Sequence, residues 1–403
     1  MRFKINTLLF LLLVFYITAC DNTDSIFNPD YEPSKSNPVI SNIFPEEGYL
    51  AGIDSIIIVG ENFSDDVDEL TINFSGEPGI VLSSTPDQII ARPARVVDDS
   101  VAVRVSSRGA VSFSNTYYYQ LDEAIFPIGN GYNEFQNTLG ITHDINGNIY
   151  FSLQNESGIA QGIKVLRPDS TVGDYLPSSV NWLALKYGPD NTIYGVRNNF
   201  GVYRESVGAI DTNPFAFGNS NEEFRNLDFG KDDFLWVVGD NENLFRVNIE
   251  NGTIKRYPFE ANLRAVRYFD DQLFVGGGFL DPVDSVFIQE VWRFDVNSSN
   301  DIVNNTKLFE INSTELANTQ ILDITFDIDG KLYFGANTGS GIYTWTSSLG
   351  VNEFYPGLIL TTGFALTWLD NFLVASIKNI GETTRHPTRI DIRKNGAPYL
   401  GIQ

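Results

Sequence analysis

The sequence predicts an all-β protein in which a β-sandwich precedes a six-bladed β-propeller. Residues 37–121 contain about seven short β-branched runs separated by Gly, Pro, Asp and Ser turns, which is typical of a small sandwich. From residue 122 to 403 one pattern recurs six times. Each copy has a small residue, an aliphatic, an aromatic, an Asp, Asn or Gly turn and a second apolar pair. Four short strands at a period of about 40 residues are the sequence signature of a propeller blade.

The first 36 residues predict export and attachment. A basic start at Arg2 and Lys4 precedes an apolar run, Leu8–Ile17, as in a secretory signal. Residues 17–20, Ile-Thr-Ala-Cys, resemble a bacterial lipobox, although that family usually has Leu where Ile17 stands. The resemblance implies cleavage after residue 19 and a lipid on the sulfur of Cys20, followed by a flexible tether to residue 36. The alternative is an ordinary secretory signal with a cysteine nearby by chance.

Composition narrows the classes of function. Cys20 is the only cysteine, so no thiol remains for a disulfide or a thiolate metal site. The formal net charge is −24, which repels nucleic acid and anionic lipid headgroups. We therefore expect no nucleic-acid partner and contact with the membrane only through the lipid. We also expect a monomer.

The sandwich segment resembles a known family. Pro38 and Pro45 flank its first strand, and residues 60–63 read Gly-Glu-Asn-Phe. These features, with Val103 and Val105 further on, resemble an IPT/TIG immunoglobulin-like domain over residues 37–121. The resemblance implies a spacer or binding module and no chemistry.

The repeats define the propeller, residues 122–403. Their aliphatic residues lie 39 to 58 residues apart: Ile141, Leu185, Leu227, Val266, Ile324 and Leu366. We attribute the one long step to extra residues in the fourth unit. Asp-Gly and Asn-Gly turns before Leu-Tyr or Ile-Tyr resemble the NHL repeat of six-bladed propellers. Residues 124–128 have no unit of their own, and we predict that they complete the last blade and close the ring.

Polar residues at the start of each first strand are the candidate ligand site. Four residues before each aliphatic the sequence places Asn137, Asn181, Glu223, Asn262, Gln320 and Thr362. Amides and one carboxylate suit sugar hydroxyls or an oxygen-liganded cation. Asn226 and Asp323 replace the usual small residue, and Trp182 could stack on a sugar face. The alternatives are that such turns favour Asn and Asp for backbone reasons and that Trp182 belongs to the core.

Catalytic machinery is not evident in the sequence. Related propeller enzymes bind Ca²⁺ or Zn²⁺ through Glu, Asn and Asp at the propeller mouth. Asn181, Glu223, Asn262 and Asp323 could imitate that cluster, with Ca²⁺ as the ion, but the family's ligand motif does not match residue by residue. His143 replaces an aromatic residue of the other units, so we predict a packed ring, and His386 is predicted in a polar loop. We assign no catalytic residue.

Together these features predict an outer-membrane lipoprotein facing the cell surface or the periplasm. Chains of this organisation resemble accessory proteins of Bacteroidetes polysaccharide uptake. We therefore predict a glycan ligand at the propeller mouth, with the sandwich as spacer. The alternatives are a scaffold that binds an envelope protein and a metal-dependent lactonase or lyase.

Overall fold

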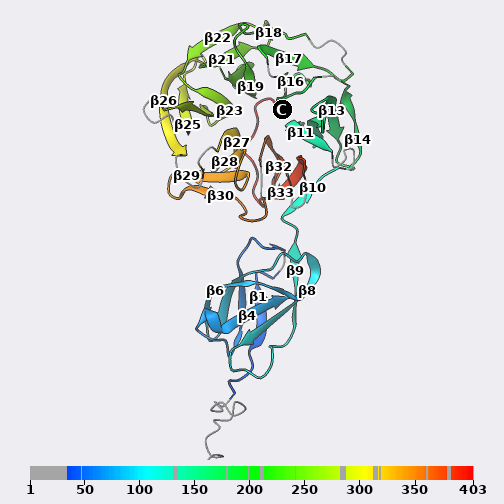
Figure 1. The fold of residues 1–403 in the computed structure, drawn as a ribbon, viewed down its shortest axis with the longest axis vertical. Helices are drawn as coiled ribbons and strands as arrows, with labels where there is room; N and C mark the ends of the chain where they lie inside the picture. The colour runs from blue at the N-terminus through cyan, green and yellow to red at the C-terminus, as the bar shows by residue number, and fades with distance from the viewer. Residues whose placement is uncertain are drawn as a thin grey trace, which may run out of the picture. The chain divides into compact units, whose positions relative to one another are not determined.

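The structure is a computed structural model of an all-β chain (Figure 1). It describes residues 34–46, 48–129, 135–177, 180–197, 199–208, 213–240, 242–281, 287–311, 316, 319–359, 362–378 and 383–402. Cys20 and the lipobox lie outside these ranges. Within them, no helix is long and apolar enough to cross a membrane. The chain divides into two compact units, the first ending at Asp122 and the second beginning at Glu123.

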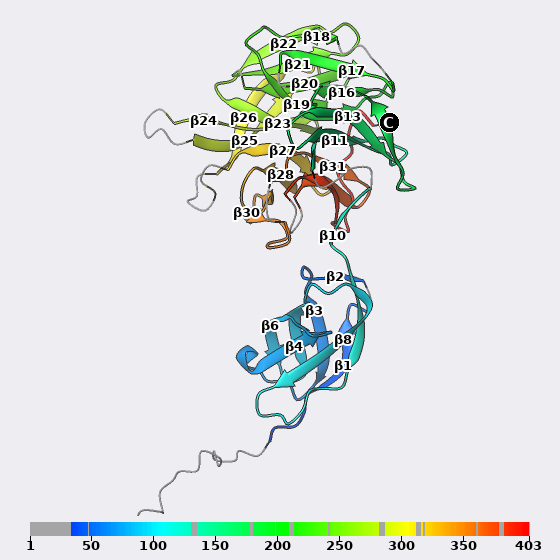
Figure 2. The same cartoon turned by 45° about the vertical axis from the view of Figure 1, so that its right-hand side comes forward.

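The first unit is a sandwich of two β-sheets (Figure 2). One sheet has the order β1-β3-β7-β6, with bounds Val39–Phe44, Ile56–Glu61, Gln88–Arg92 and Ile80–Thr85. The other has the order β2-β9-β8-β4-β5, with bounds Tyr49–Leu50, Tyr117–Asp122, Asp98–Ser107, Leu70–Phe74 and Glu77–Pro78. A 3-10 turn, η1 (Val67–Glu69), precedes β4. Alternate residues such as Ile56, Ile58, Val103 and Val105 are buried in one core between the sheets, as the period of two along a strand requires.

The Gly-Glu-Asn-Phe segment has a structural explanation. A Cβ added at Gly60 would lie 1.9 Å from the carbonyl oxygen of Val39, so only glycine fits there. Asn62 has a φ of 63°, a left-handed conformation that Asn tolerates better than most residues. This turn directs Phe63 into the sandwich core.

The second unit is a six-bladed propeller, because its described residues form six four-stranded antiparallel sheets. Blade 1 comprises β11 to β14: Gln136–His143, Ile149–Asn155, Ala160–Leu166 and Val172–Leu176. Blade 2 comprises β15 to β18: Ala184–Tyr187, Ile193–Val196, Gly201–Glu205 and Ala216–Phe217. Blade 3 comprises β19 to β22: Phe224–Phe229, Phe234–Gly239, Asn243–Asn248 and Ile254–Pro258.

Blade 4 comprises β23 to β26: Asn262–Phe269, Gln272–Leu280, Phe287–Val296 and Ile302–Ile311. Its outer strands are longer than those of the other blades, which accounts for the long step between the fourth and fifth repeats. Blade 5 comprises β27 to β30: Ile321–Phe326, Leu332–Ala336, Ile342–Thr346 and Gly350–Glu353. Blade 6 comprises β31 to β33 and β10: Leu366–Leu369, Phe372–Ile377, His386–Asp391 and Ile125–Pro127.

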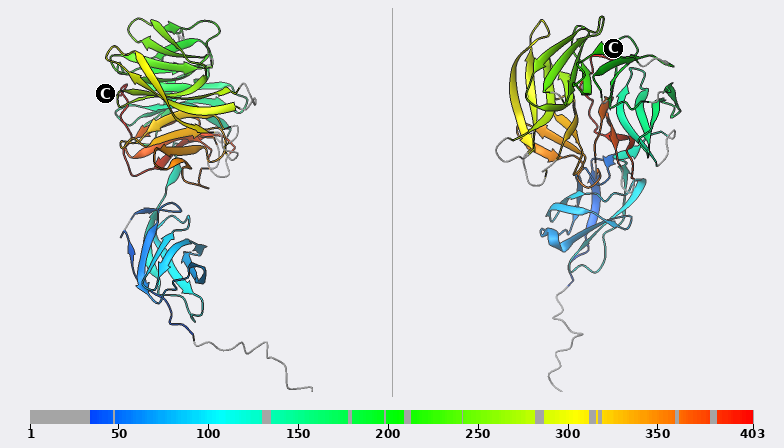
Figure 3. Two further views of the ribbon diagram at one scale, coloured as in Figure 1. Left: turned by 90° about the vertical axis from the view of Figure 1, so that its left-hand side faces the viewer. Right: turned by 45° about the horizontal axis from the view of Figure 1, so that its top comes forward.

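The last blade closes the ring in the predicted way. Strand β10 pairs antiparallel with β33, with Ile125 opposite Ile390. Each innermost strand contacts the next, and β31 contacts β11. Figure 3 shows the propeller from its edge, with the C-terminal end of the chain at one face.

The turns between the first and second strands explain the Asp, Asn and Gly of the repeat. Each turn contains a residue in the left-handed region, where Gly, Asn and Asp are enriched. These residues are Gly147, Asn191, Asp232, Asp233, Asp270, Asp271, Gly330 and Asp370. The repeated sequence signal is therefore a backbone requirement of the hairpin.

Candidate ligand site on the propeller axis

A pocket lies on the propeller axis, lined by residues of or just before the innermost strand of all six blades. Its volume is about 110 Å³, which is enough for the end of a ligand but not for a large one. Its apolar lining includes Leu183, Leu322 and Phe364. Its polar lining consists of Lys186, Arg225, Arg264, Asn226 and Asp323.

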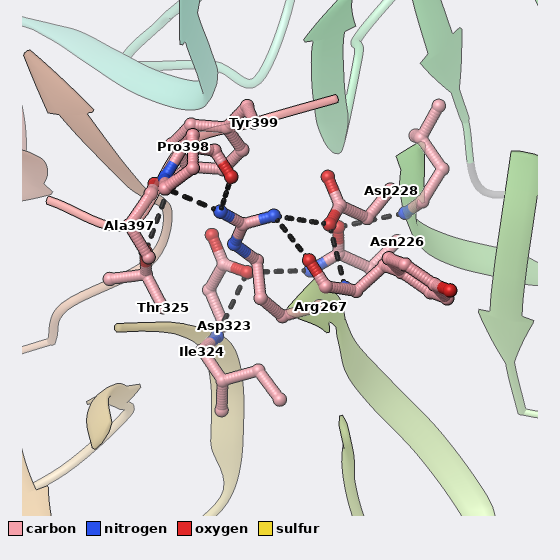
Figure 4. A network of polar contacts seen from close by, with 11 residues as sticks. Asn226, Asp228, Arg267, Asp323, Ile324, Thr325, Ala397, Pro398 and Tyr399 are labelled. Carbon is pink, nitrogen blue, oxygen red and sulfur yellow. Dashed lines mark hydrogen bonds and ion pairs between the residues drawn. The ribbon is translucent and has the colours of Figure 1, made fainter. Parts of the chain in front are cut away.

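A buried amide–carboxylate pair joins blades 3 and 5 (Figure 4). Asn226 Nδ2 donates to Asp323 Oδ1 at 3.0 Å. The backbone N–H groups of Ile324 and Leu366 donate to the Asp323 carboxylate at 2.9 Å and 2.8 Å. Burial raises the pKa of Asp323, while Lys186 and these three donors oppose that change. Asp323 thus ties blades 3, 5 and 6 together, and its oxygens already have donors.

Lys186 is the most buried cation of the pocket lining, with 5 % of its surface exposed. Its ammonium nitrogen lies 5.0 Å from the ring centre of Tyr399. Burial lowers the pKa of Lys186, but the nearby charges of Asp228 and Asp323 outweigh burial, so the pKa is raised overall. Lys186 therefore carries its proton at neutral pH.

Two arginines stand side by side at the rim of the pocket. Arg225 Nε and Arg264 Nη2 both donate to Asp240 Oδ2, at 2.8 Å and 3.1 Å. Arg225 Nη2 also donates to Glu223 Oε2 at 2.9 Å. Asp240 thus holds two like-charged guanidinium groups next to each other, which would otherwise repel.

The C-terminal segment, residues 394–402, lies at the opposite end of the channel, and Figure 4 shows Ala397, Pro398 and Tyr399 beside Arg267. Arg267 Nη2 donates to the carbonyl oxygens of Ala397 and Pro398, at 3.1 Å and 2.7 Å. Arg267 Nη1 donates to Asp228 Oδ2 at 2.9 Å, and both side chains are almost completely buried. The charges at this end are therefore paired within the protein.

Tyr399 anchors the segment across four blades. Its hydroxyl shares a hydrogen bond of 2.9 Å with Thr325 Oγ1. Its ring lies 3.8 Å from the Arg267 guanidinium carbon and packs edge-on against His143. The segment therefore packs against the innermost strands of blades 1, 2, 4 and 5 at one end of the channel.

Most of the polar residues predicted to form the ligand site hydrogen-bond to nearby residues and do not line this pocket. Asn137 Oδ1 accepts from the Arg385 backbone N–H at 3.0 Å, and Asn181 Nδ2 donates to the Gly158 carbonyl oxygen at 2.8 Å. Gln320 and Thr362 are both tied to Asn337. These contacts fit the backbone interpretation of the ring.

The other predicted residues divide into two groups. Asn226 and Asp323, the two polar residues at the small-residue position, do line the pocket. Glu223 is exposed beside Arg225, and Asn262 borders a separate hollow with Glu242 and Glu260.

Trp182 corrects the expectation of sugar stacking. Its ring is 0 % exposed and packs edge-on against Tyr203. It therefore presents no face to a ligand, and the alternative of a core side chain is the one that the structure shows.

The cations of the pocket were missed from the sequence, although a signal was present. Arg225 and Arg264 stand two residues before the repeated aliphatic, where the other four units have Leu139, Leu183, Leu322 and Phe364. Two neighbouring charges at an otherwise apolar position mark the pocket rim. Lys186 stands one residue after the aliphatic, on the same face of the strand as the small residue two positions earlier.

The two histidines have structural positions. His143 is a packed ring, as predicted, and its Nδ1 lies 2.9 Å from Thr367 Oγ1. Burial, with smaller effects of neighbouring charges, lowers the pKa of His143 to about 4. The prediction of a polar loop for His386 is wrong, because His386 begins β33 and is 4 % exposed.

The candidate metal ligands do not fit a divalent cation. Of Asn181, Glu223, Asn262 and Asp323, only Asp323 lines the pocket. The described residues contain no group of three His, Cys, Asp or Glu side chains placed to hold a metal ion. A cation beside Asp323 would also face the like charges of Lys186, Arg225 and Arg264.

Comparison with known proteins identifies the first unit. The family model of the IPT/TIG domain matches residues 38–120. This segment is an IPT/TIG domain. No curated protein matches the chain, so the comparison assigns no family to the propeller.

Solved structures support the fold. A putative phosphatase from Bacteroides thetaiotaomicron matches with a TM-score of 0.53 at 12 % identity, over 90 % of this chain and 99 % of that one. A putative gluconolactonase matches with a TM-score of 0.50 at 12 % identity, over 68 % of this chain and 94 % of that one. An auxiliary nutrient binding protein from B. thetaiotaomicron has a TM-score of 0.49 at 11 % identity, over 90 % and 99 %. At these identities the first two matches concern the fold alone, and nothing is concluded from the third.

Proposed function

We propose that this protein is an envelope lipoprotein that binds the end of a glycan in the axial pocket and performs no chemistry on it. The axial pocket carries this proposal. It is a small cavity lined by polar and apolar side chains of all six blades. Concave sites with an apolar wall and a few oriented polar groups are typical of ligand binding.

Sugar residues present both surfaces that such a pocket needs. Their C–H faces match Leu183, Leu322 and Phe364, and their hydroxyls match the donors of Lys186 and the two rim arginines. The neighbouring carboxylates are committed to hydrogen bonds and ion pairs within the protein. Binding therefore accounts for this arrangement without a reaction.

Affinity electrophoresis of the soluble chain against a panel of polysaccharides tests glycan binding. We expect retardation by at least one polysaccharide. We also expect its loss in Ala365→Leu, because the larger side chain fills the pocket that Ala365 lines. Ala160→Leu, at a partly exposed position of β13, is the matched control. If no polysaccharide retards the folded protein, glycan binding is refuted.

The membrane anchor rests on the lipobox resemblance at residues 17–20. We expect the full chain to partition into the detergent phase with the outer-membrane fraction, and Cys20→Ser to remain in the aqueous phase. Equal partitioning of the two proteins would contradict the anchor and leave the pocket unaffected.

A further inference from the structure

The axial pocket has more hydrogen-bond donors than acceptors. Among the described residues, no hydrogen bond or ion pair engages the Lys186 ammonium, although 95 % of the residue is buried. Arg264, whose side chain is partly exposed, uses one of its five N–H groups, for Asp240. A largely buried donor such as the Lys186 ammonium is costly without an acceptor. The pocket therefore lacks acceptors, and a ligand can supply them.

Asp323, the carboxylate in the pocket lining, cannot serve as the missing acceptor. Asp323 accepts from Asn226 and from two backbone N–H groups. Asp228, behind Lys186, accepts from Arg267 and from the Tyr268 N–H. Three cations and one carboxylate thus line the pocket, in a chain whose net charge is −24.

The cations are held in place before a ligand arrives. Asp240 Oδ2 binds both Arg225 and Arg264. Lys186 lies over the Tyr399 ring, which is itself fixed by the Thr325 hydroxyl. Donors fixed in position bind an anion with less loss of side-chain freedom than mobile ones.

We propose that the pocket selects an acidic sugar, with an anionic group that only accepts hydrogen bonds, a carboxylate or a sulfate ester, bound by Lys186 and Arg264. This inference rests on the proposed glycan binding. The sugar ring faces Leu322 and Phe364. Because the net charge of −24 repels densely charged polyanions, the ligand carries its acid at the chain end and is otherwise neutral.

Isothermal titration at fixed salt concentration tests the inference with four matched disaccharides. Their terminal residues are glucuronic acid, its methyl ester, glucose and glucose 6-sulfate. We expect one of the two anions to bind about tenfold or more tightly than the ester and glucose, since hydrogen bonds to charged groups are the stronger ones. The two anionic probes distinguish carboxylate from sulfate.

Two variants locate the effect. Lys186→Met and Arg264→Gln should each reduce binding of the preferred anion about tenfold or more. Each should reduce binding of glucose by a clearly smaller factor, because hydrogen bonds from a charged donor to a neutral hydroxyl are weaker than those to an anion. Lys255→Met, at a half-exposed lysine on outer strand β22, should change neither. Arg264 lies at the rim, so its variant keeps the test valid if Lys186→Met does not fold.

The outcomes separate the two proposals. Equal binding of glucose, ester and anions refutes the acidic sugar and leaves glycan binding standing. If Lys255→Met weakens binding of the anion as much as Lys186→Met and Arg264→Gln do, the acidic sugar is also refuted. No binding of any probe refutes the acidic sugar, while glycan binding is decided separately by the polysaccharide panel.

Discussion

The two ends of the propeller channel are built by the same innermost strands but differ in how their charges are satisfied. At the closed end, Arg267 is bound by Asp228 and by carbonyl oxygens of the C-terminal segment. Lys186, which lies over the Tyr399 ring and lines the pocket, lacks such partners among the described residues, and Arg264 at the open end has one. Burial alone therefore does not distinguish the charges at the two ends. They differ in whether the buried charge has partners within the protein.

Arg267→Leu is the strongest test of the closed end. We expect the free energy of unfolding of the propeller to fall by about 3–5 kcal/mol, because the change leaves Asp228 buried without its cation. All five tryptophans lie in the propeller, so tryptophan fluorescence during urea unfolding reports this unit. The exposed Arg204→Leu, 3.8 Å from Asp190, should cost less than about 1 kcal/mol. Similar costs for both variants would contradict the comparison.

His143 gives the closed end a pH dependence. The unfolded chain protonates this histidine below about pH 6.5, whereas the folded protein does so near pH 4. Between these values the unfolded state binds more protons, so stability falls as the pH decreases, by about 3 kcal/mol in all. Lys186, Arg267 and Asp144 are the charges that act on the ring.

His143→Phe isolates this contribution. Phenylalanine occupies the same position in blades 3 and 5, as Phe229 and Phe326. We expect the free energy of unfolding of the variant, measured in urea, to fall less between pH 6.5 and pH 4 than that of the original protein, because the contribution of His143 is removed. If the variant loses as much free energy of unfolding between pH 6.5 and pH 4 as the original protein does, the assignment to His143 is refuted.

Tyr399→Phe should have a smaller effect. It keeps the ring between Arg267 and His143 but removes the hydroxyl bonded to Thr325, at a cost of about 1 kcal/mol. Tyr118→Phe, at an exposed tyrosine of the IPT/TIG domain, should leave propeller unfolding unchanged. If Tyr399→Phe is as stable as the original protein, the hydroxyl contributes nothing to the stability of the propeller.

Arg264→Met should have the smallest effect on stability. The side chain donates one hydrogen bond and is partly exposed, so we expect a change of less than about 1 kcal/mol in urea unfolding. A loss comparable with that of Arg267→Leu would make Arg264 a structural residue and remove the contrast between the two ends.

Much of the fold was predictable because the same residue pattern recurs in every blade. Left-handed turn residues and buried aliphatics recur in every blade, and residues 124–128 were correctly assigned to the last one. The site was predicted only in part. Asn226 and Asp323 stood out because the other repeats have small residues at this crowded position. The rim arginines did not, because the sequence alone does not show whether side chains at their position point into the pocket.

The C-terminal segment and Trp182 show why the rest could not be predicted. Residues 394–402 carry no repeat signal, yet they reach strands of four blades through Tyr399. Trp182 follows a polar turn residue, and the sequence does not specify that its ring is buried beside Tyr203. Both depend on contacts between segments that are distant along the chain.

The closure of the ring by β10 has a consequence for biosynthesis. Ile125 emerges from the ribosome early but pairs with Ile390, so the first propeller strand must wait for almost the whole chain. The carbonyl partners of Arg267, at Ala397 and Pro398, are made later still. Such distant pairings fold slowly, and a chain truncated before β33 would leave both a blade edge unpaired and a cation buried without its acceptors.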